Sequence, residues 1–431
     1  MGYNLIVLIF IISFSKGILE LIGIQDTMIQ LGIEFLILFT ILLGLSNILR
    51  NSKLIIPALI SMIFIFITTF LSYLLTDVNN LQFVLYFRKL LLYILFFYAL
   101  FNINITQIQK KKIIALLMIL FIIQIPAALI KLFVLGGTLE KIVGTMSVTE
   151  GSLATIMPLF PIVYLISHYL EYKNNKDMFL VVLFIGIGLI SNKLGILFYV
   201  IGLFALLSYL YARTRFFIPN FRLIKKLITS TFYALIIFSL FVSLNPRANP
   251  EHKVGGSIDI EYLQAFVEDY QTLDLKSGVE GDGRFDAPFV AFDRLYSAGI
   301  TNILFGFGPG EIIQSSFLRY KNPLLEKYNI GYGGRLGVVW ILMQVGLIGL
   351  LLFTYFHFYL LKEMFKLYKL DVLTKDENII LLTGIGFSLI FFIDFFSYSS
   401  EILHSPGIAL TYYFTIYYIF SEYREREVSN V

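Results

Sequence analysis

The chain has 431 residues, of which 58% are hydrophobic and 14% are charged, and its net charge is +4. Soluble domains carry about a quarter charged residues, so this composition excludes an ordinary soluble domain and predicts a protein that crosses a membrane several times. The sequence contains no cysteine and four histidines, which excludes a disulfide framework and a thiolate metal site.

Apolar stretches long enough to cross a bilayer recur along the whole chain. A span needs about 20 mainly apolar residues, because the hydrocarbon core is about 30 Å thick. Twelve such stretches are predicted, at 2–20, 28–49, 54–76, 82–101, 112–135, 151–170, 178–192, 194–212, 226–244, 336–360, 378–397 and 405–421. The first lacks a basic start and a small-residue cleavage site, so we expect a retained span. The predicted fold is all-α, a polytopic membrane helix bundle with one long outer loop that contains short amphipathic helices.

Lysine and arginine gather in alternate short loops, and the positive-inside rule places these loops in the cytoplasm. They lie at 50–53, 110–112, 173–176, 213–226, 362–375 and 424–426. Both termini are then predicted to be cytoplasmic, and the outward loops are those around Asp77 and at 136–150, 191–194, 245–335 and 398–404. The chain divides into 1–244 with spans one to nine, the extracytoplasmic loop 245–335, and 336–431 with the last three spans and a cytoplasmic tail.

The loop 245–335 is the long polar interval of the sequence. It has nine Lys and Arg against twelve Asp and Glu, a charge of −3 that leaves +7 for the rest of the chain. An anion site in this loop must therefore be built from individual arginines. Two amphipathic helices are predicted here, one with an apolar stripe over 258–273. The second runs from after Arg284 to Gly299, with Pro288 in its first turn. On it Phe285, Phe289, Phe292 and Leu295 share one face, and we expect both helices to cover the outer end of the bundle as a lid.

Arg284 stands in a Gly-Asp-Gly-Arg turn just before the second of these helices. Exposed backbone N–H groups and a guanidinium could together hold a phosphate there. The alternative is a structural arginine that pairs with Asp282 or Asp286 and fastens the turn.

The segment Gly306–Gly310, followed by Glu311, is a glycine-rich turn. Such a turn lets a ligand approach the backbone closely. It lacks the spacing of a dinucleotide fingerprint and the lysine of a P-loop. The alternative is a tight re-entry turn in which Glu311 favours the N-terminus of a following helix.

The remaining outer cations are Arg335, Lys193 and Arg88 with Lys89. Arg335 precedes the tenth span and binds a lipid headgroup or anchors the chain at the interface. Lys193 and Arg88 indicate a polar cavity, or are anchors at helix ends. Asp394 lies inside span eleven as a counter-ion or as a hydrogen-bonded acid. The four histidines show neither metal-ligand spacing nor a Ser/His/Asp set, which favours catalysis by arginines and a carboxylate.

Three local patterns accompany the predicted topology. They are Gly283-Arg284 ahead of a helix, the turn Gly306–Gly310 after Ile303-Leu304-Phe305, and Gln344–Leu350 within span ten. Together they resemble the O-antigen ligase and O-antigen polymerase superfamily of bacterial envelope polysaccharide assembly. The resemblance covers about Gly144 to Phe353 and is topological elsewhere.

Two positions depart from that family's patterns. Members often show Ser-Arg-Gly after the seventh span, where this chain has Asn192-Lys193-Leu194-Gly195. Ligases carry a His-Asn pair eleven residues before the glycine that matches Gly346, where this chain has Arg335-Leu336. The ligases' histidine is thought to act as base on the acceptor hydroxyl, and arginine, with a pKa above about 12, cannot do so. This difference favours the polymerase branch.

The resemblance implies a metal-independent glycosyltransferase without cofactor. Its donor is a glycan on a polyprenyl diphosphate, and its acceptor is the sugar end of another lipid-linked repeat unit. Arg284 is implied to bind the diphosphate and stabilise it as leaving group, Arg335 to share that task or orient the acceptor, and Lys193 to add a third contact. Expected partners are membrane lipids, a chain-length regulator and a flippase, but no nucleic acid, at the bacterial cytoplasmic membrane.

The general base is not assigned by the resemblance. Asp282, Asp286 and Glu311 are candidates by their proximity in sequence, and Asp286 is preferred. The predicted substrate-binding residues are Lys193, Arg88, Gly308, Gly310, Asp282 and Glu311.

Three other functions compete with the polymerase. A ligase that transfers finished polymer to a lipid or wall acceptor would share the donor site. A flippase for lipid-linked oligosaccharide would line a central cavity with cations between short loops. A secondary transporter would show broken helices in paired halves.

Overall fold

The structure, a computed structural model, describes residues 1–45, 56–134, 142–148, 152–191, 193, 195–214, 239, 242, 249–251, 253, 255–265, 283–313, 327–328, 330, 335–369 and 373–429. These residues form helices, turns and bends, and no strand occurs among them. Most of the predicted ninth span, 226–244, and the candidate base Asp282 lie outside the described residues.

The helices of the first half of the chain follow the predicted apolar stretches closely. They are α1 (Gly2–Phe14), α2 (Lys16–Leu21), α3 (Asp26–Leu45), α4 (Ile56–Leu75), α5 (Asn80–Leu100), α6 (Gln107–Phe133), α7 (Leu153–Tyr172), α8 (Asn175–Ile190) and α9 (Gly195–Thr214). The first predicted span is in fact two helices, because the chain leaves the helical conformation at Ser15.

The second half contributes α12 (Ala287–Ala298), α13 (Ile300–Phe305), α15 (Gly337–Tyr368), α16 (Lys375–Ser397), α17 (Glu401–His404) and α18 (Pro406–Ser429). Among the described residues, seven helices are long and apolar enough to cross a membrane, namely α3, α4, α5, α6, α7, α15 and α16. An all-helical membrane bundle is thereby confirmed. The total of twelve spans stays a prediction.

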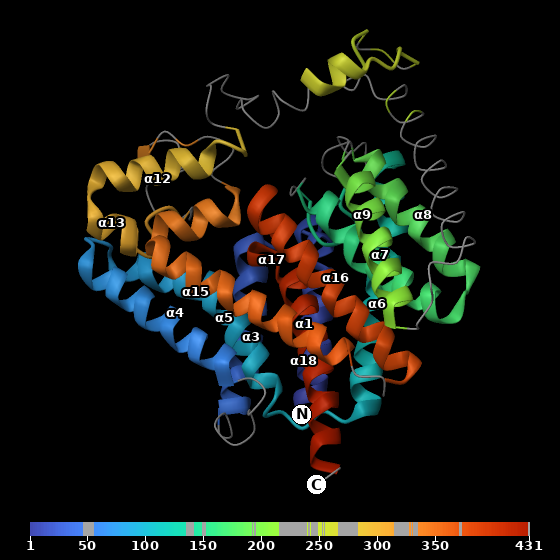
Figure 1. Cartoon of the computed structure of the whole chain (residues 1–431), viewed down its shortest axis with the longest axis horizontal. Helices are drawn as coiled ribbons and strands as arrows, with labels where there is room; N and C mark the ends of the chain where they lie inside the picture. The colour runs from blue at the N-terminus through green and yellow to red at the C-terminus, as the bar shows by residue number, and fades with distance from the viewer. Residues whose placement is uncertain are drawn as a thin grey trace.

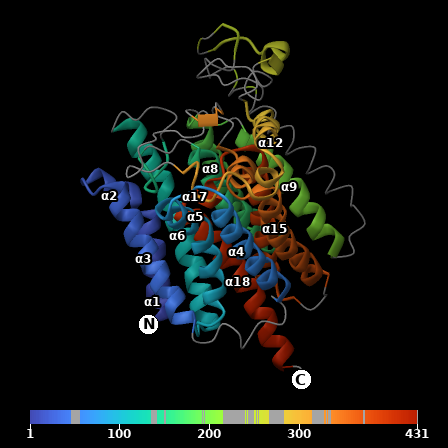
Figure 2. The same ribbon diagram turned by 90° about the vertical axis from the view of Figure 1, so that its left-hand side faces the viewer.

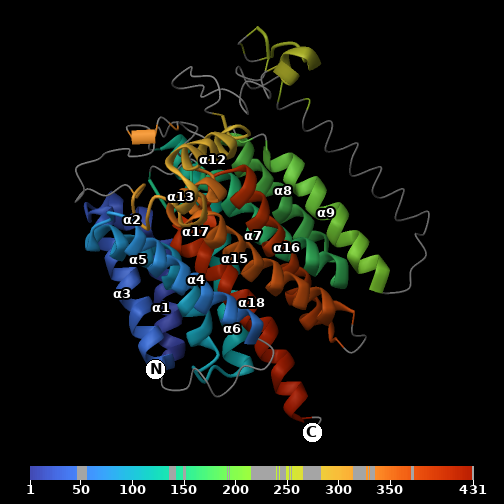
Figure 3. The same ribbon diagram turned by 60° about the vertical axis from the view of Figure 1, so that its left-hand side comes forward.

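The bundle has two different ends. Helix α1 begins and α18 ends at one end, whereas α12 and α13 lie at the other, and the views in Figures 1, 2 and 3 agree on this. We call the end that carries α12, α13 and α17 the loop end. Its position opposite the two termini matches the side on which the sequence predicts the long loop.

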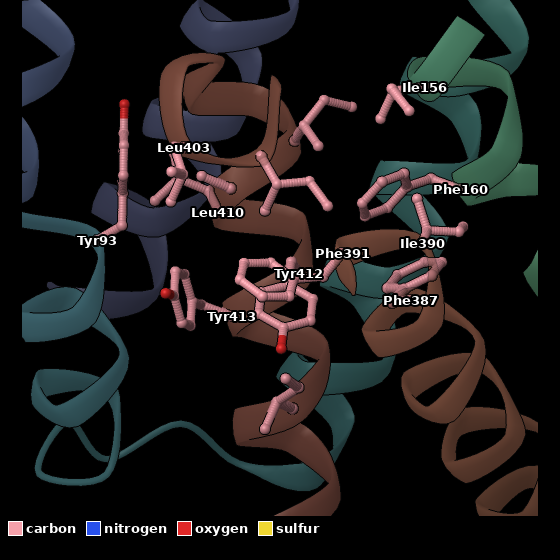
Figure 4. Packing of buried hydrophobic residues seen from close by; sticks show 14 of the residues in the cluster. Tyr93, Ile156, Phe160, Phe387, Ile390, Phe391, Leu403, Leu410, Tyr412 and Tyr413 are labelled. Carbon is pink, nitrogen blue, oxygen red and sulfur yellow. The ribbon is translucent and has the colours of Figure 1, made fainter. Parts of the chain in front are cut away.

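Helix α18 is the central element of the bundle. Every described side chain from Pro406 to Ser421 is buried, and the helix packs against α1, α5 and α16. Aromatic rings fill the space around it (Figure 4): Tyr412 stacks on Phe391 with ring centres 5.5 Å apart. On the neighbouring pair of helices, Phe160 meets Phe387 at 4.4 Å. These contacts fix α16 and hence the turn that follows it.

Helix α15 is interrupted at Gly346, which has φ 69° and ψ −169°. A Cβ atom at this position would lie 2.3 Å from the carbonyl oxygen of Leu304, so only glycine fits. A break in a helix leaves backbone carbonyls without their partners inside the helix. Here the carbonyls of Met343 and Gln344 accept hydrogen bonds from the amides of Phe307 and Gly308, at 2.8 and 3.1 Å.

The helix predicted after Arg284 is confirmed as α12, with Pro288 in its first turn and Gly299 directly after its last residue. The predicted face is wrong in one respect. Leu295 is buried together with Ala287 and Ala291, whereas Phe285, Phe289 and Phe292 are exposed. Residues at intervals of four follow one side of the helix, and small alanines there let α12 approach α13 and α15 closely. The bundle is therefore covered by the alanine side.

Candidate functional site

The turn 398–401 links α16 to α17 and includes the first residue of α17. It is a polar element at the loop end, and we call it the outer turn. The buried carboxylate of Asp394 organises it, since it accepts hydrogen bonds from the amides of Ser399 and Ile402 at 3.2 and 3.0 Å. Ser400 takes the left-handed conformation with φ 56°, which tightens the turn. Of the two roles predicted for Asp394, the hydrogen-bonded acid accounts for these contacts.

Arg284 lies against the outer turn although it stands more than a hundred residues before it. The carbon of its guanidinium is 4.5 Å from the centre of the Tyr398 ring, and the residue is only 5% exposed. A cation over an aromatic face is attracted by the negative charge of the ring. Charge interactions are stronger where water is excluded, so this position suits an arginine that recognises an anion.

Arg335 reaches the same turn through its backbone. Its carbonyl oxygen accepts a hydrogen bond of 2.9 Å from the Ser400 hydroxyl, and its side chain is exposed. The two arginines that the sequence singles out are thus joined to positions 398 and 400 of one turn. The side chain of Arg284 is buried, whereas that of Arg335 is exposed.

Glu401 is an acid of the outer turn and is not among the site residues predicted from the sequence. It is 7% exposed, and its carboxylate accepts hydrogen bonds from the hydroxyls of Ser152 and Ser399. Tyr398 is held in a similar way, because its hydroxyl shares a hydrogen bond of 2.7 Å with Thr155 of α7. In the sequence, Glu401 is marked only by three nearby serines in a predicted outward loop. Its position in the site depends on contacts with residues at the start of α7.

The predicted glycine turn forms a different element, which we call the glycine joint: Gly306–Gly310 together with Met343–Gly346. Besides the two amide bonds to α15, the amide of Gly310 donates to the Gln344 side-chain oxygen at 2.8 Å. The Ser72 hydroxyl of α4 donates to the carbonyls of Phe305 and Gln344, at 2.5 and 3.1 Å. The amides of Gly308 and Gly310, predicted to bind substrate, face partners within the protein.

Glu311, a predicted base, belongs to the glycine joint as well. Its carboxylate contacts Lys327 and accepts hydrogen bonds from Tyr328 at 3.1 Å and Gln82 at 3.4 Å. Burial and this carboxylate raise the pKa of the Tyr328 hydroxyl, so the hydroxyl stays protonated as the donor. These contacts anchor the end of segment 283–313 to α5 and to residues 327 and 328.

The other predicted residues are dispersed. Arg88 on α5 forms an ion pair with Glu34 on α3, with 3.1 Å between nitrogen and oxygen. Lys193 follows α8, and its amide donates to the Gly188 carbonyl at 2.9 Å. Asp286 precedes α12 directly and is half-buried. Their roles in substrate binding or catalysis stay predictions.

His404 ends α17 close to the outer turn. Its ring packs edge-on against Trp340, with centres 5.3 Å apart. Desolvation of the ring and the nearby Lys89 ammonium lower the pKa of His404 to about 3. The imidazole is therefore neutral at neutral pH and a weak base.

Comparison of the chain with models of known protein families and with curated proteins gave no match.

Proposed function

We propose that the protein is a polymerase that joins polyprenyl-diphosphate-linked oligosaccharide repeat units into an O-antigen, capsular or exopolysaccharide chain. The reaction takes place at the outer face of the bacterial cytoplasmic membrane. The observation that carries the proposal is the attachment of Arg284 and Arg335 to one polar turn at the loop end of a helical membrane bundle. This arrangement supplies cations where the headgroup of a lipid-linked substrate would lie.

In the proposed reaction a hydroxyl of the acceptor sugar attacks the anomeric carbon of the donor. The bond from that carbon to the diphosphate oxygen breaks, and the polyprenyl diphosphate leaves with the electron pair. Arg284 stabilises the charge that develops on the leaving group, as guanidinium groups do for phosphates. Because Arg284 is held over the Tyr398 ring, its orientation is fixed before the substrate binds.

Glu401 takes the proton of the acceptor hydroxyl in this proposal. Arginine at position 335 cannot act as a base, and the low pKa of His404 makes its imidazole a weak one. Glu401 is fixed by the hydroxyls of Ser152 and Ser399, and a carboxylate held in one position can act as a general base. The exposed side chain of Arg335 orients the acceptor or shares the diphosphate.

A ligase is the second candidate, because it would use the same donor site. The observation that favours the polymerase is Arg335 at the position where the resemblance places the ligase histidine. A flippase is a third candidate and needs no catalytic base.

A deletion strain analysed for lipid-linked and surface glycan tests the proposal. Loss of long chains, with single repeat units still delivered to the surface, is the result expected for a polymerase. Full-length polymer stranded on the polyprenyl carrier would instead indicate a ligase, and repeat units trapped on the cytoplasmic leaflet would indicate a flippase.

A further inference from the structure

Helix α12 has three chemically different sides. Ala287, Ala291 and Leu295 are completely buried on the side that packs against α13 and α15. A second side carries an aromatic row that begins at Phe285, two residues before the helix, and continues at intervals of four, three and four residues. The members of this row are between 40% and 69% exposed: Phe285, Phe289, Phe292 and Tyr296. A third side is polar and exposed, with Asp293, Arg294 and Ser297.

Such a row is unfavourable in water. An aromatic side chain can bury about 150–250 Å² of surface, and the stabilisation gained on removing apolar surface from water grows with the area removed. Contiguous apolar surface of this kind marks an interaction site.

The aromatic row continues a surface that already faces lipid. Helix α4 is a candidate membrane span, and its exposed residues include Phe64, Ile67, Phe70 and Leu74. Helix α13 joins α12 to α4: it packs against both helices, and its Ile300 is 68% exposed. Figures 1 and 3 show α12 and α13 next to the end of α4 at the edge of the molecule.

The three sides of α12 fit the boundary between lipid and water. Aromatic residues are enriched at this boundary, and helices that lie in its plane combine an aromatic side with a charged one. We propose that α12 is an interfacial helix whose aromatic row contacts the chains of bilayer lipids in the outer leaflet. Its polar side faces water, and its alanine side faces the bundle.

This position has a consequence for the candidate site. Arg284 directly precedes Phe285, the first ring of the row, so insertion of the row holds Arg284 at the depth of lipid headgroups. The diphosphate of a lipid-linked substrate lies at the same depth. The lipid contact of α12 does not depend on the proposed reaction.

Tryptophan fluorescence tests the proposal on the full chain in vesicles. Trp340 is the single tryptophan of the sequence, so a Trp340→Phe background lacks tryptophan emission. Phe289→Trp reports on the aromatic row, and Arg294→Trp is the matched control on the polar side. The vesicles contain phosphatidylglycerol and phosphatidylethanolamine with or without dibrominated acyl chains, which quench only a tryptophan within reach of the chains.

We expect brominated lipid to quench Phe289→Trp at least about twofold more than Arg294→Trp. Both positions lie within α12, but they are on different sides of the helix, and only the aromatic side is expected to contact the acyl chains. Aqueous iodide should quench Arg294→Trp more. Tyr296→Trp serves as a second reporter if Phe289→Trp does not fold.

Quenching of Phe289→Trp and Tyr296→Trp by iodide alone would overturn the proposal, because the row would then face water. Protection from both quenchers together with a dimer in crosslinking would also overturn it in favour of a second copy of the chain. The readout needs no turnover, so a failure of the polymerase proposal leaves this result unchanged.

Discussion

The glycine joint and the outer turn lie at the same end of the bundle but differ in what their polar groups contact. In the glycine joint, the amides of Phe307, Gly308 and Gly310 bond to α15, so the turn is an attachment of the loop to a broken helix. In the outer turn, an arginine lies over a tyrosine and two hydroxyls fix an acid. A glycine-rich turn can therefore be structural, while a serine-rich turn without other distinguishing features brings the charged groups together.

The difference predicts that the same substitution has unlike effects in the two elements. Glu401→Gln should lower the rate of chain lengthening by about 10²–10⁴-fold, because general-base catalysis contributes about that much. Glu311→Gln is the matched control and should leave the rate within a few-fold, since Glu311 contacts Lys327 and Tyr328 in the glycine joint. The rate is measured with purified protein and lipid-linked repeat units. Equal losses in the two variants would contradict the assignment of Glu401.

Arg284→Ala should lower the rate by about 10²–10³-fold, the usual loss when one donor to a developing negative charge is removed. Arg294→Ala is the control, because Arg294 is exposed on the polar side of α12, ten residues further along the chain. Both variants should reach the membrane at the level of the unchanged protein. If Arg284→Ala still produces polymer of normal length, Arg284 has no part in catalysis.

Gly346→Ala tests the structural role of the glycine joint. The positive φ and the Leu304 carbonyl 2.3 Å from the added Cβ should reduce stability by at least about 2 kcal/mol, as strained backbone and overpacking do. Gly32→Ala on α3, where no atom lies within 4 Å, should be neutral or slightly stabilising. Thermal unfolding in detergent, followed by size-exclusion chromatography, measures both. An unchanged unfolding temperature of Gly346→Ala would show that the break in α15 is not required.

Substitution of Tyr398 should have the smallest effect on the rate of chain lengthening. Tyr398→Leu removes the aromatic face under Arg284 and should slow chain lengthening by about threefold to tenfold, in line with a cation–π energy of about 1 kcal/mol. Tyr398→Phe keeps the ring and removes the hydroxyl that bonds to Thr155, so it should stay closer to the unchanged protein. Identical rates for the two variants would show that the Tyr398 ring does not contribute to the function of Arg284.

Much of the fold can be predicted from the sequence, because the thickness of a bilayer limits the length of an apolar helix. The stretch predicted at 54–76 is α4, Ile56–Leu75, and the outward loop predicted at 191–194 falls between the end of α8 at Ile190 and the start of α9 at Gly195. Helix α12 is predictable because Pro288 and Gly299 mark its two ends. The break at Gly346 is not, since a glycine inside an apolar span gives no local sign of a positive φ.

The candidate site is predictable only in part. Arg284 and Arg335 stand out as outer cations, and the structure joins both to one turn. The outward loop at 398–404 is predicted, but its role and that of Glu401 are not, because they depend on contacts with Arg284 and with residues at the start of α7, which are far away in the chain. The exposed side of α12 is misjudged for a related reason. Periodicity shows which residues share a side of a helix, but not which side meets the protein.

The most direct test of the central claim is a reconstitution with purified protein, in vesicles supplied with one polyprenyl-diphosphate-linked repeat unit as both donor and acceptor. We predict a ladder of lengthened, lipid-linked glycans from the unchanged protein and from Arg294→Ala, and single units alone from Arg284→Ala. Single units alone from the unchanged protein, or a ladder of equal length from Arg284→Ala, would contradict the account.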